Sequence, residues 1–221
     1  MMSSDLKLAI FDCDGTLVDG QHMIISSMKM ASERCNIPYP GDEPVRRIVG
    51  LSLYEAITRV YPDLKEIDHG RLQKEFIEHF QFLRTLDDQH EPLYDGVREV
   101  ILELDKMGIL LGIATGKSSR GLKKTLHNHG LDGHFVTLNT ADDGPGKPDP
   151  SMINVALAET GVKKENAVMI GDTTYDMIMA KQAGVRSVGV TWGYHETHEL
   201  VSSGANHIIS HISELVELMK E

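Results

Sequence analysis

Short apolar runs alternate with amphipathic stretches along most of this 221-residue chain, and this alternation restricts the fold more than any other feature. The amphipathic stretches repeat apolar residues every three or four positions, as helices do. The apolar runs predict strands at residues 6–11, 109–114, 135–139, 167–170, 187–190 and 207–209. Strands and helices in regular order predict an α/β fold, a doubly wound (Rossmann-like) parallel sheet with helices on both faces.

One long region interrupts the alternation, because residues 21–89 show helical patterns and no convincing strand. Three helices are predicted there: one through residues 23–35, one opening at the capping-box pattern Ser52-x-x-Glu55, and one through residues 72–83. A crossover helix between parallel strands needs far fewer residues. We therefore expect an inserted helical unit, residues 18–89, within a core formed by residues 1–17 and 90–221.

The charge balance excludes some classes of partner. The chain carries 22 basic and 33 acidic side chains, a net charge of −11. That field repels nucleic acid and anionic membranes, so neither is an expected partner. Two cysteines do not make a disulfide framework, the first strand begins too early for a signal peptide, and no apolar run approaches the roughly 20 residues that cross a bilayer. We expect a cytoplasmic protein, and the sequence leaves open whether it is a monomer or a small homo-oligomer.

Two carboxylates, Asp12 and Asp14, stand one residue apart where the first predicted strand ends. Like charges this close repel each other, so such a pair usually needs a positive group beside it. A hard cation such as Mg2+ is the simplest candidate, because it takes carboxylate and carbonyl oxygens. An ordinary Asp-Gly turn explains the pair by itself equally well.

Three further segments carry polar residues at points where a predicted strand ends or a helix begins. Thr115 and Gly116 end the second strand before a helix start, which makes an anion cradle or an ordinary helix N-cap. Lys147 precedes a proline and is held extended, although a solvated lysine is the commoner outcome for such a segment. Asp172 ends the fourth strand, and Asp176 follows about one helical turn later, where aspartates also occur for dipole reasons alone.

Topology unites these separate signals. In a doubly wound sheet of order 3-2-1-4-5-6, the first and fourth strands are neighbours where the winding reverses, and ligands bind outside their carboxyl ends. Asp12 ends the first strand, Asp172 the fourth and Thr115 the second. Lys147 lies in the loop after the third strand. These side chains are therefore predicted to face one crevice, as a metal site with an anion site beside it.

These residues, in this order, resemble the motifs of the haloacid dehalogenase superfamily of phosphohydrolases. Asp12-Cys-Asp-Gly-Thr resembles the first motif, Thr115 the second, Lys147 the third, and Gly171-Asp172 with Asp176 the fourth. The helical insertion is similar to the cap of the phosphoglycolate phosphatase and β-phosphoglucomutase branch. The resemblance covers the whole core and implies a Rossmann-like core with an inserted all-helical cap domain.

The resemblance also implies roles for the site residues. Asp12 would be the nucleophile that forms an aspartyl-phosphate, and Asp14 the general acid and then the general base. The phosphoryl oxygens would be bound by three residues of the second and third motifs: Thr115, Gly116 and Lys147. A Mg2+ cofactor would be held by the side chains of Asp12 and Asp172 and by the backbone carbonyl of Asp14. Asp176 would either bind the ion directly or support its ligands from behind.

The implied activity is Mg2+-dependent hydrolysis of a small phosphorylated metabolite that is phosphoglycolate-like. Asp14 favours phosphoryl transfer over carbon–halogen cleavage, because only a leaving oxygen needs a proton. Phosphomutase relatives carry an arginine after a Gly-x-Ser in the cap, whereas Gly50-Leu-Ser-Leu53 has an apolar residue there. Arg46 or Arg47 could take the place of that arginine. A phosphomutase and a pyrophosphatase remain alternatives, and a catalytically idle binding relative is a weaker one.

Substrate specificity is expected to come from the insertion. The candidates that face the substrate are Arg46, Arg47, Leu51 and Ser52. A solvated helix face is the commoner position for either arginine taken singly. The histidines show no convincing ligand spacing, and we expect His195 and His198 on an exposed loop or helix.

Overall fold

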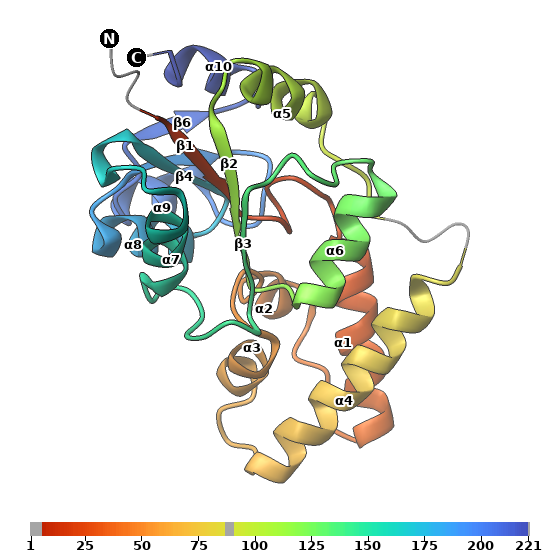
Figure 1. Ribbon diagram of the computed structural model, residues 1–221. Helices are drawn as coiled ribbons and strands as arrows, with labels where there is room; N and C mark the ends of the chain where they lie inside the picture. The colour runs from red at the N-terminus through yellow and green to blue at the C-terminus, as the bar shows by residue number, and fades with distance from the viewer. Residues whose placement is uncertain (1–5, 87–90, 221) are drawn as a thin grey trace, which may run out of the picture.

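The computed structural model describes residues 6–86 and 91–220, arranged as an α/β unit joined to a group of helices (Figure 1). The predicted boundary between insertion and core, at residues 89 and 90, lies outside the described residues, as do residues 1–5 and 221. The sheet has the order β3-β2-β1-β4-β5-β6, and each neighbouring pair is parallel. Its strands are β1 (Leu8–Phe11), β2 (Leu110–Ala114), β3 (Thr137–Asn139), β4 (Ala167–Gly171), β5 (Arg186–Val190) and β6 (His207–Ile209). The predicted fold class and strand order are confirmed.

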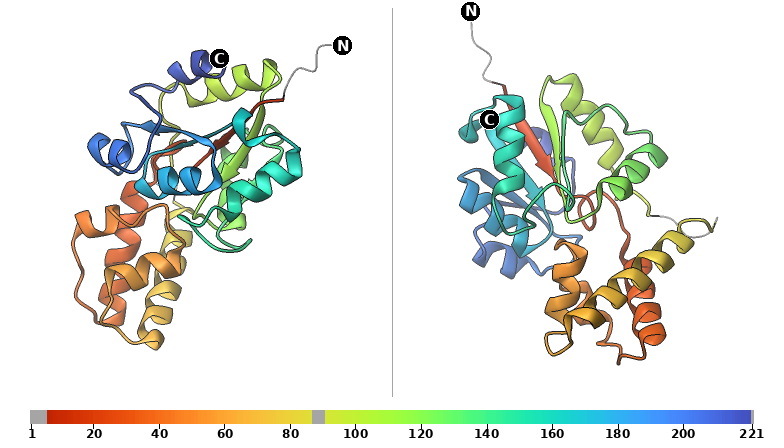
Figure 2. Two further views of the ribbon diagram at one scale, coloured as in Figure 1. Left: turned by 90° about the vertical axis from the view of Figure 1, so that its left-hand side faces the viewer. Right: turned by 60° about the horizontal axis from the view of Figure 1, so that its bottom comes forward.

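Helices cover both faces of the sheet, as Figure 2 shows from two further directions. They are α5 (Val97–Lys106), α6 (Ser119–Asn128), α7 (Ser151–Thr160), α8 (Thr174–Ala183), α9 (Thr197–Ser202) and α10 (Glu214–Leu218), with a 3-10 turn at Lys164–Asn166. Alternate residues of β1 enter two different cores. Ala9 and Phe11 pack with residues of α5, α6 and α10, whereas Leu8 and Ile10 pack with residues of α7 and α8. A strand that is buried on both faces reads as a continuous apolar run, which is why β1 was recognisable in the sequence.

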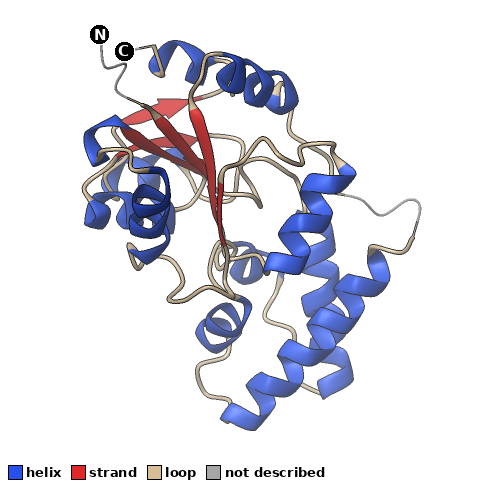
Figure 3. Cartoon of the chain, in the orientation of Figure 1, coloured by secondary structure: helices blue, strands red, loops and turns tan. Residues whose placement is uncertain are grey.

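The helical insertion leaves the core after β1 and returns before α5. Its described residues form helices joined by loops, with no strand (Figure 3), and the helices are α1 (Gln21–Cys35), α2 (Asp42–Arg46), α3 (Leu53–Val60) and α4 (Glu66–Leu83). These helices have a hydrophobic cluster of their own, formed by residues such as Met28, Ile57 and Leu72. The three-helix prediction missed α2, whose single short turn buries only Val45 and leaves little periodic signal. The division into two domains stays a prediction.

The capping-box pattern Ser52-x-x-Glu55 predicted the correct start of a helix, but the predicted hydrogen bonds do not form. Helix α3 does begin at Leu53, directly after Ser52. However, the Ser52 side chain makes no capping hydrogen bond, so the Ser52-x-x-Glu55 box does not form. Ser52 instead lines a cavity between the insertion and the core.

A small apolar cluster joins the insertion to the core. Ile48, Leu51 and Ala56 of the insertion pack with Tyr175, which lies on α8 of the core. The hydroxyl of Tyr175 donates a hydrogen bond to the backbone carbonyl of Arg47 (3.1 Å). The insertion therefore rests on the carboxyl edge of the sheet. Among the described residues, no helix has both the length and the apolar character needed to cross a membrane.

Candidate active site

Two aspartates follow adjacent parallel strands and therefore arrive at the same edge of the sheet. Asp12 comes directly after β1 and Asp172 directly after β4, and the register pairs Phe11 with Ile170. The N–H of Asp12 extends this pairing by donating to the carbonyl of Ile170 (2.9 Å). Strands β1 and β4 are the neighbours at which the winding of the sheet reverses, so both carboxylates enter the crevice where ligands bind in such folds.

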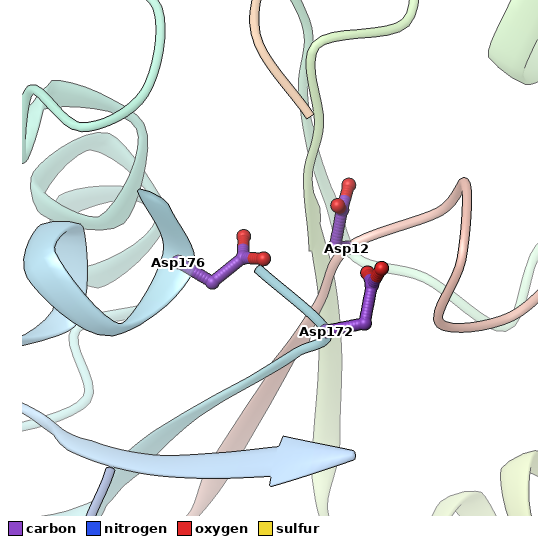
Figure 4. A group of neighbouring side chains, drawn as sticks. All are labelled: Asp12, Asp172 and Asp176. Carbon is purple, nitrogen blue, oxygen red and sulfur yellow. The ribbon is translucent and has the colours of Figure 1, made fainter. Parts of the chain in front are cut away.

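A third aspartate completes one buried cluster (Figure 4). Carboxylate oxygens of Asp12, Asp172 and Asp176 lie within 4.8 Å of one another, and all three residues are fully buried. The Nζ of Lys147, also fully buried, lies 2.8 Å from Oδ1 of Asp12 and 2.6 Å from Oδ1 of Asp176. One ammonium group against three carboxylates leaves two negative charges without compensation.

That excess of negative charge makes ionisation of the cluster unfavourable. Burial raises the pKa of Asp12 to about 7, with repulsion from Asp176 adding to the effect and Lys147 opposing it. Burial, and then repulsion from Asp12, also raises the pKa of Asp172 well above its usual range. In addition, Oδ2 of Asp12 is buried and has no hydrogen-bond partner among the described residues. A hard divalent cation would supply the missing charge and take carboxylate oxygens, so the residues present suit Mg2+.

The backbone around Asp172 passes so close to its carboxylate that only glycine fits. A Cβ on Gly15, which has a φ of +86°, would lie 2.2 Å from Oδ2 of Asp172, and one on Gly193 would lie 2.1 Å from Cβ of Asp172. The hydroxyl of Thr16 donates to Oδ1 of Asp172 (2.8 Å), and the N–H of Tyr194 donates to Oδ2 (2.9 Å). These contacts hold the carboxylate in one orientation.

Asp176 has a structural task besides its place in the cluster. The N–H and the hydroxyl of Thr173 both donate to Oδ2 of Asp176 (3.0 and 2.7 Å), which forms the capping box of α8. Its other oxygen, Oδ1, contacts Lys147. Asp176 therefore caps α8 through one oxygen and contacts Lys147 through the other, and its role at a metal site stays a prediction.

Thr115 and Gly116 lie at the same edge of the sheet, after β2. Both line a cavity together with Asp12 and Asp14. The hydroxyl of Thr115 accepts a hydrogen bond from the N–H of Lys117 (3.2 Å). A Cβ on Gly116 would lie 2.4 Å from the carbonyl oxygen of Leu51, so the absence of a side chain lets the insertion approach the core here. All predicted residues of the four motifs are therefore brought to one edge of the sheet, and their roles stay predictions.

A second buried lysine, Lys117, was not singled out from the sequence. Its Nζ lies 2.7 Å from Oδ1 of Asp14 and 2.8 Å from Oε1 of Glu91. Arg84, at the end of α4, donates to Oε2 of Glu91 through Nε (3.0 Å) and Nη2. Two cations and two carboxylates balance, so this group carries no excess charge. The only available signal was the position of Lys117, two residues after Thr115.

The pKa values in this second group reflect its balance. Burial by itself raises the pKa of Glu91, but attraction from Lys117 and Arg84 outweighs it and lowers that pKa to about 2. Burial opposes the charge on Lys117, yet Asp14 and Glu91 raise its pKa above the usual range. All four side chains are at most 12% exposed. Such a group holds the Asp14 carboxylate in place through residues of both the core and the insertion.

The cavity beside these groups has a volume of about 590 Å³ and lies between the core and the insertion. Leu51 and Ser52, two of the predicted specificity residues, line it. Arg46 and Arg47 do not line it. Arg46 pairs with Glu43 (3.0 Å), and Arg47 pairs with Glu199 of α9.

His195 is a correction to the sequence prediction, since it is buried and not on an exposed loop. Its Nδ1 accepts a hydrogen bond from the N–H of Thr174 (3.1 Å), and its Nε2 lies 3.1 Å from the carbonyl oxygen of Arg47. The ring thus links the start of α8 to the insertion, a contact that no local pattern in the sequence indicates. His198 is exposed, as expected.

Comparison with known proteins identifies the family. Residues 9–190 match the family of haloacid dehalogenase-like hydrolases. This chain belongs to the haloacid dehalogenase-like hydrolases. The predicted resemblance is confirmed, and the family match covers β1 to β5 with the four motifs and the insertion.

Individual members of the family match over nearly their whole length. The chain is 32% identical to a probable phosphatase, IndB, of Dickeya dadantii, over 95% of this chain and 91% of that protein. It is 29% identical to a phosphoglycolate phosphatase of Vibrio parahaemolyticus (99% and 98%) and 28% identical to the pyrophosphatase PpaX of Bacillus pumilus (99% of each). A solved haloacid dehalogenase-like hydrolase from Bacteroides fragilis superposes with a TM-score of 0.87 at 25% identity, over 95% and 99% of the two chains.

Proposed function

We propose that this chain is a Mg2+-dependent phosphatase that hydrolyses a small phosphorylated metabolite through an aspartyl-phosphate. The family and the phosphatase names of its relatives support the enzyme class, a phosphoric monoester hydrolase. The observation that carries the proposal is the buried Asp12–Asp172–Asp176 cluster with Lys147, which has two uncompensated negative charges beside an open cavity. Buried charge of this kind is costly unless a ligand compensates it, and it is typical of functional sites.

The first half-reaction transfers the phosphoryl group to the protein. A carboxylate oxygen of Asp12 attacks phosphorus, a new O–P bond forms, and the bond between phosphorus and the ester oxygen breaks. Asp14 acts as the general acid and gives a proton to the leaving oxygen, so an alcohol departs. Asp12, Asp172, Asp176 and the backbone carbonyl of Asp14 would hold Mg2+, which would supply positive charge to the phosphoryl oxygens.

The second half-reaction restores the enzyme. Asp14, now a carboxylate, takes a proton from water, and the water oxygen bonds to phosphorus while the bond to Asp12 breaks. Inorganic phosphate leaves. Lys147, the hydroxyl of Thr115 and the N–H groups that follow it, including that of Gly116, bind the phosphoryl oxygens in both steps and stabilise their negative charge. Lys117 holds the Asp14 carboxylate in position.

The insertion, residues 18–89, acts as a cap in this proposal, because it closes one side of the cavity and brings Leu51 and Ser52 to it. A substrate of the phosphoglycolate type is one candidate, since a relative carries that name. The phosphomutase alternative is weaker, since Leu53 stands where a mutase has its arginine and lines the cavity with an apolar side chain. We place the enzyme in the cytoplasm, as a monomer or small homo-oligomer.

The test is a panel of phosphate compounds assayed with Mg2+ or with a chelator. The panel includes p-nitrophenyl phosphate, phosphoglycolate, glucose 1-phosphate and pyrophosphate. We expect Mg2+-dependent release of inorganic phosphate from monoesters, and its loss in Asp12→Asn by at least about a thousandfold. Isomerisation of glucose 1-phosphate without phosphate release would favour the mutase, and no turnover anywhere on the panel would refute the hydrolase.

A further inference from the structure

The walls of the cavity differ sharply in character between the core and the insertion. On the core side lie the polar groups of the site, such as Asp12, Asp14 and Thr115. The insertion side is mainly aliphatic and aromatic, with contributions from α1, α4 and the loop between α2 and α3: Ile24, Met28, Ile48, Leu51, Phe76, Ile77 and Phe80. The leaving group of any substrate bound at Asp12 would therefore extend toward an apolar surface.

Part of this apolar wall is not covered by the protein itself. Ile77 of α4 lines the cavity and is 40% exposed, and so is Tyr54 at the start of α3. Leu72 and Phe76 of the same helix pack into the core of the insertion. Burial of an exposed aliphatic side chain by an apolar ligand is favourable, because it removes apolar surface of both from water.

The charges near the phosphoryl site do not suit a small anionic leaving group. Two buried cations line the cavity, Lys117 and Arg84, and both are already paired with Glu91, Lys117 also with Asp14. Two other cations line it from α6, Arg120 and Lys124, and both are exposed to solvent. Exposed charges are screened by water and salt and contribute little binding energy.

The size of the cavity leads to the same conclusion. A volume of about 590 Å³ is in the range of pockets that hold drug-sized ligands. Phosphoglycolate, whose leaving group is a two-carbon acid, would leave most of this space to water and would place its carboxylate against an apolar wall. A carboxylate removed from water without a free cation binds poorly.

We propose that the preferred substrates are phosphate monoesters of alcohols with an apolar ring or branched chain, which packs against Ile77 and its neighbours on the insertion. The proposal rests on the proposed phosphatase function and narrows its substrate class. It separates this chain from its phosphoglycolate-named relatives by the alcohol part of the substrate and not by the chemistry at phosphorus.

The experiment compares 2-phenylethyl phosphate, ethyl phosphate and phosphoglycolate with the full-length enzyme and Mg2+. The first two have similar alcohol leaving groups, so their difference in kcat/KM reports the apolar extension. We expect kcat/KM for 2-phenylethyl phosphate to exceed the values for the other two by at least about tenfold. Equal or higher kcat/KM for phosphoglycolate would overturn the proposal.

A matched pair of variants assigns the preference to the apolar wall. Ile77→Asp places a charge in the cavity, whereas Ile67→Asp makes the same change on the same helix at a residue that is 70% exposed and does not line the cavity. Ile77→Asp should lower kcat/KM for 2-phenylethyl phosphate by about tenfold more than kcat/KM for ethyl phosphate. Ile67→Asp should change neither. If Ile77→Asp affects both substrates equally, or neither, the proposal is wrong.

Failure of this inference is distinguishable from failure of the proposed function. p-Nitrophenyl phosphate serves as the reference substrate in the same assay, because its leaving group, nitrophenolate, departs without being protonated. If no substrate, including this one, releases phosphate with Mg2+, the hydrolase itself is refuted. If the reference is hydrolysed and the apolar preference is absent, the hydrolase stands and only the substrate class is overturned.

Discussion

Two buried lysines, Lys147 and Lys117, occupy similar surroundings, but the groups around them differ in net charge. Each ammonium group contacts two carboxylates at 2.6 to 2.8 Å, those of Asp12 and Asp176 for Lys147 and those of Asp14 and Glu91 for Lys117. The Lys147 group also includes Asp172 and is short of two positive charges, whereas Arg84 balances the Lys117 group. The first arrangement calls for a cation from outside, and the second is complete. The difference separates residues that bind a ligand from residues that hold a catalytic group in place.

Of the changes to these two groups, removing Lys117 from the balanced group should lower the free energy of unfolding the most. Lys117→Met leaves Glu91 paired with Arg84 but removes the cation that pairs with the carboxylate of Asp14. Removing one partner of a buried ion pair costs about 3–5 kcal/mol, so we expect the free energy of unfolding to fall by about that amount. Urea denaturation measures it. A change below about 1 kcal/mol would show that the group is not a structural unit.

Lys117→Met should also lower kcat/KM, and the loss should be larger for substrates whose leaving oxygen must be protonated. A displaced Asp14 carboxyl no longer gives its proton to the leaving oxygen, which matters for ethyl phosphate and little for p-nitrophenyl phosphate. We expect kcat/KM to fall by about a hundredfold for the first and by much less for the second. Equal losses for both would indicate a general disturbance of the site and not a positioning role of Lys117.

The unbalanced group should respond to metal, and the balanced one should not. Saturation with Mg2+ at a hundred times its Kd should stabilise the native protein by about 2.7 kcal/mol. Asp172→Asn should lose most of this gain, because it removes one of the three clustered carboxylates. Glu91→Gln, the matched control in the balanced group, should keep it. Thermal unfolding with and without Mg2+ measures both, and an equal loss in the two variants would contradict the distinction.

Acid should remove the contribution of Glu91. Its pKa is lowered to about 2 in the folded protein from an ordinary value of 4.5, so its stabilisation is present in full above pH 4.5 and is lost as the pH falls toward 2. The difference in free energy of unfolding between wild type and Glu91→Gln should therefore shrink over that interval. A difference that stays constant, or grows, on acidification would contradict this assignment.

The smallest effect is expected at an ion pair outside both groups. Arg47 and Glu199 join the insertion to α9, and their side chains are 35% and 24% exposed. Exposed pairs of this kind contribute about 0–1 kcal/mol, so Glu199→Gln should change the free energy of unfolding by no more than that. A loss as large as that of Lys117→Met would mean that the contact between insertion and core depends on this pair.

Much of the fold could be predicted from the sequence, because its signals are local. A strand buried on both faces is a continuous apolar run, and glycines mark the ends of several helices, as Gly161 and Gly184 do here in left-handed conformation. Helix α2 was missed because a single turn has no period to recognise. The capping box at Ser52 failed because tertiary contacts placed that side chain at the cavity instead.

The residues of the site also fall into those that the sequence places together and those that only the tertiary structure brings together. Asp12, Thr115 and Asp172 could be placed together without coordinates, because parallel strands in the observed order end at one edge and motif residues at those ends must meet there. Lys117 and Asp14 are 103 residues apart, and Glu91 and Arg84 join them from the segments that connect the insertion to the core. No periodicity encodes such contacts. The sequence by itself determined the sheet and the residues at its edge, since hydrophobic pattern and strand direction are properties of the chain. Only the tertiary structure decided which charges are balanced and what lines the cavity, because both depend on how the insertion packs against that edge.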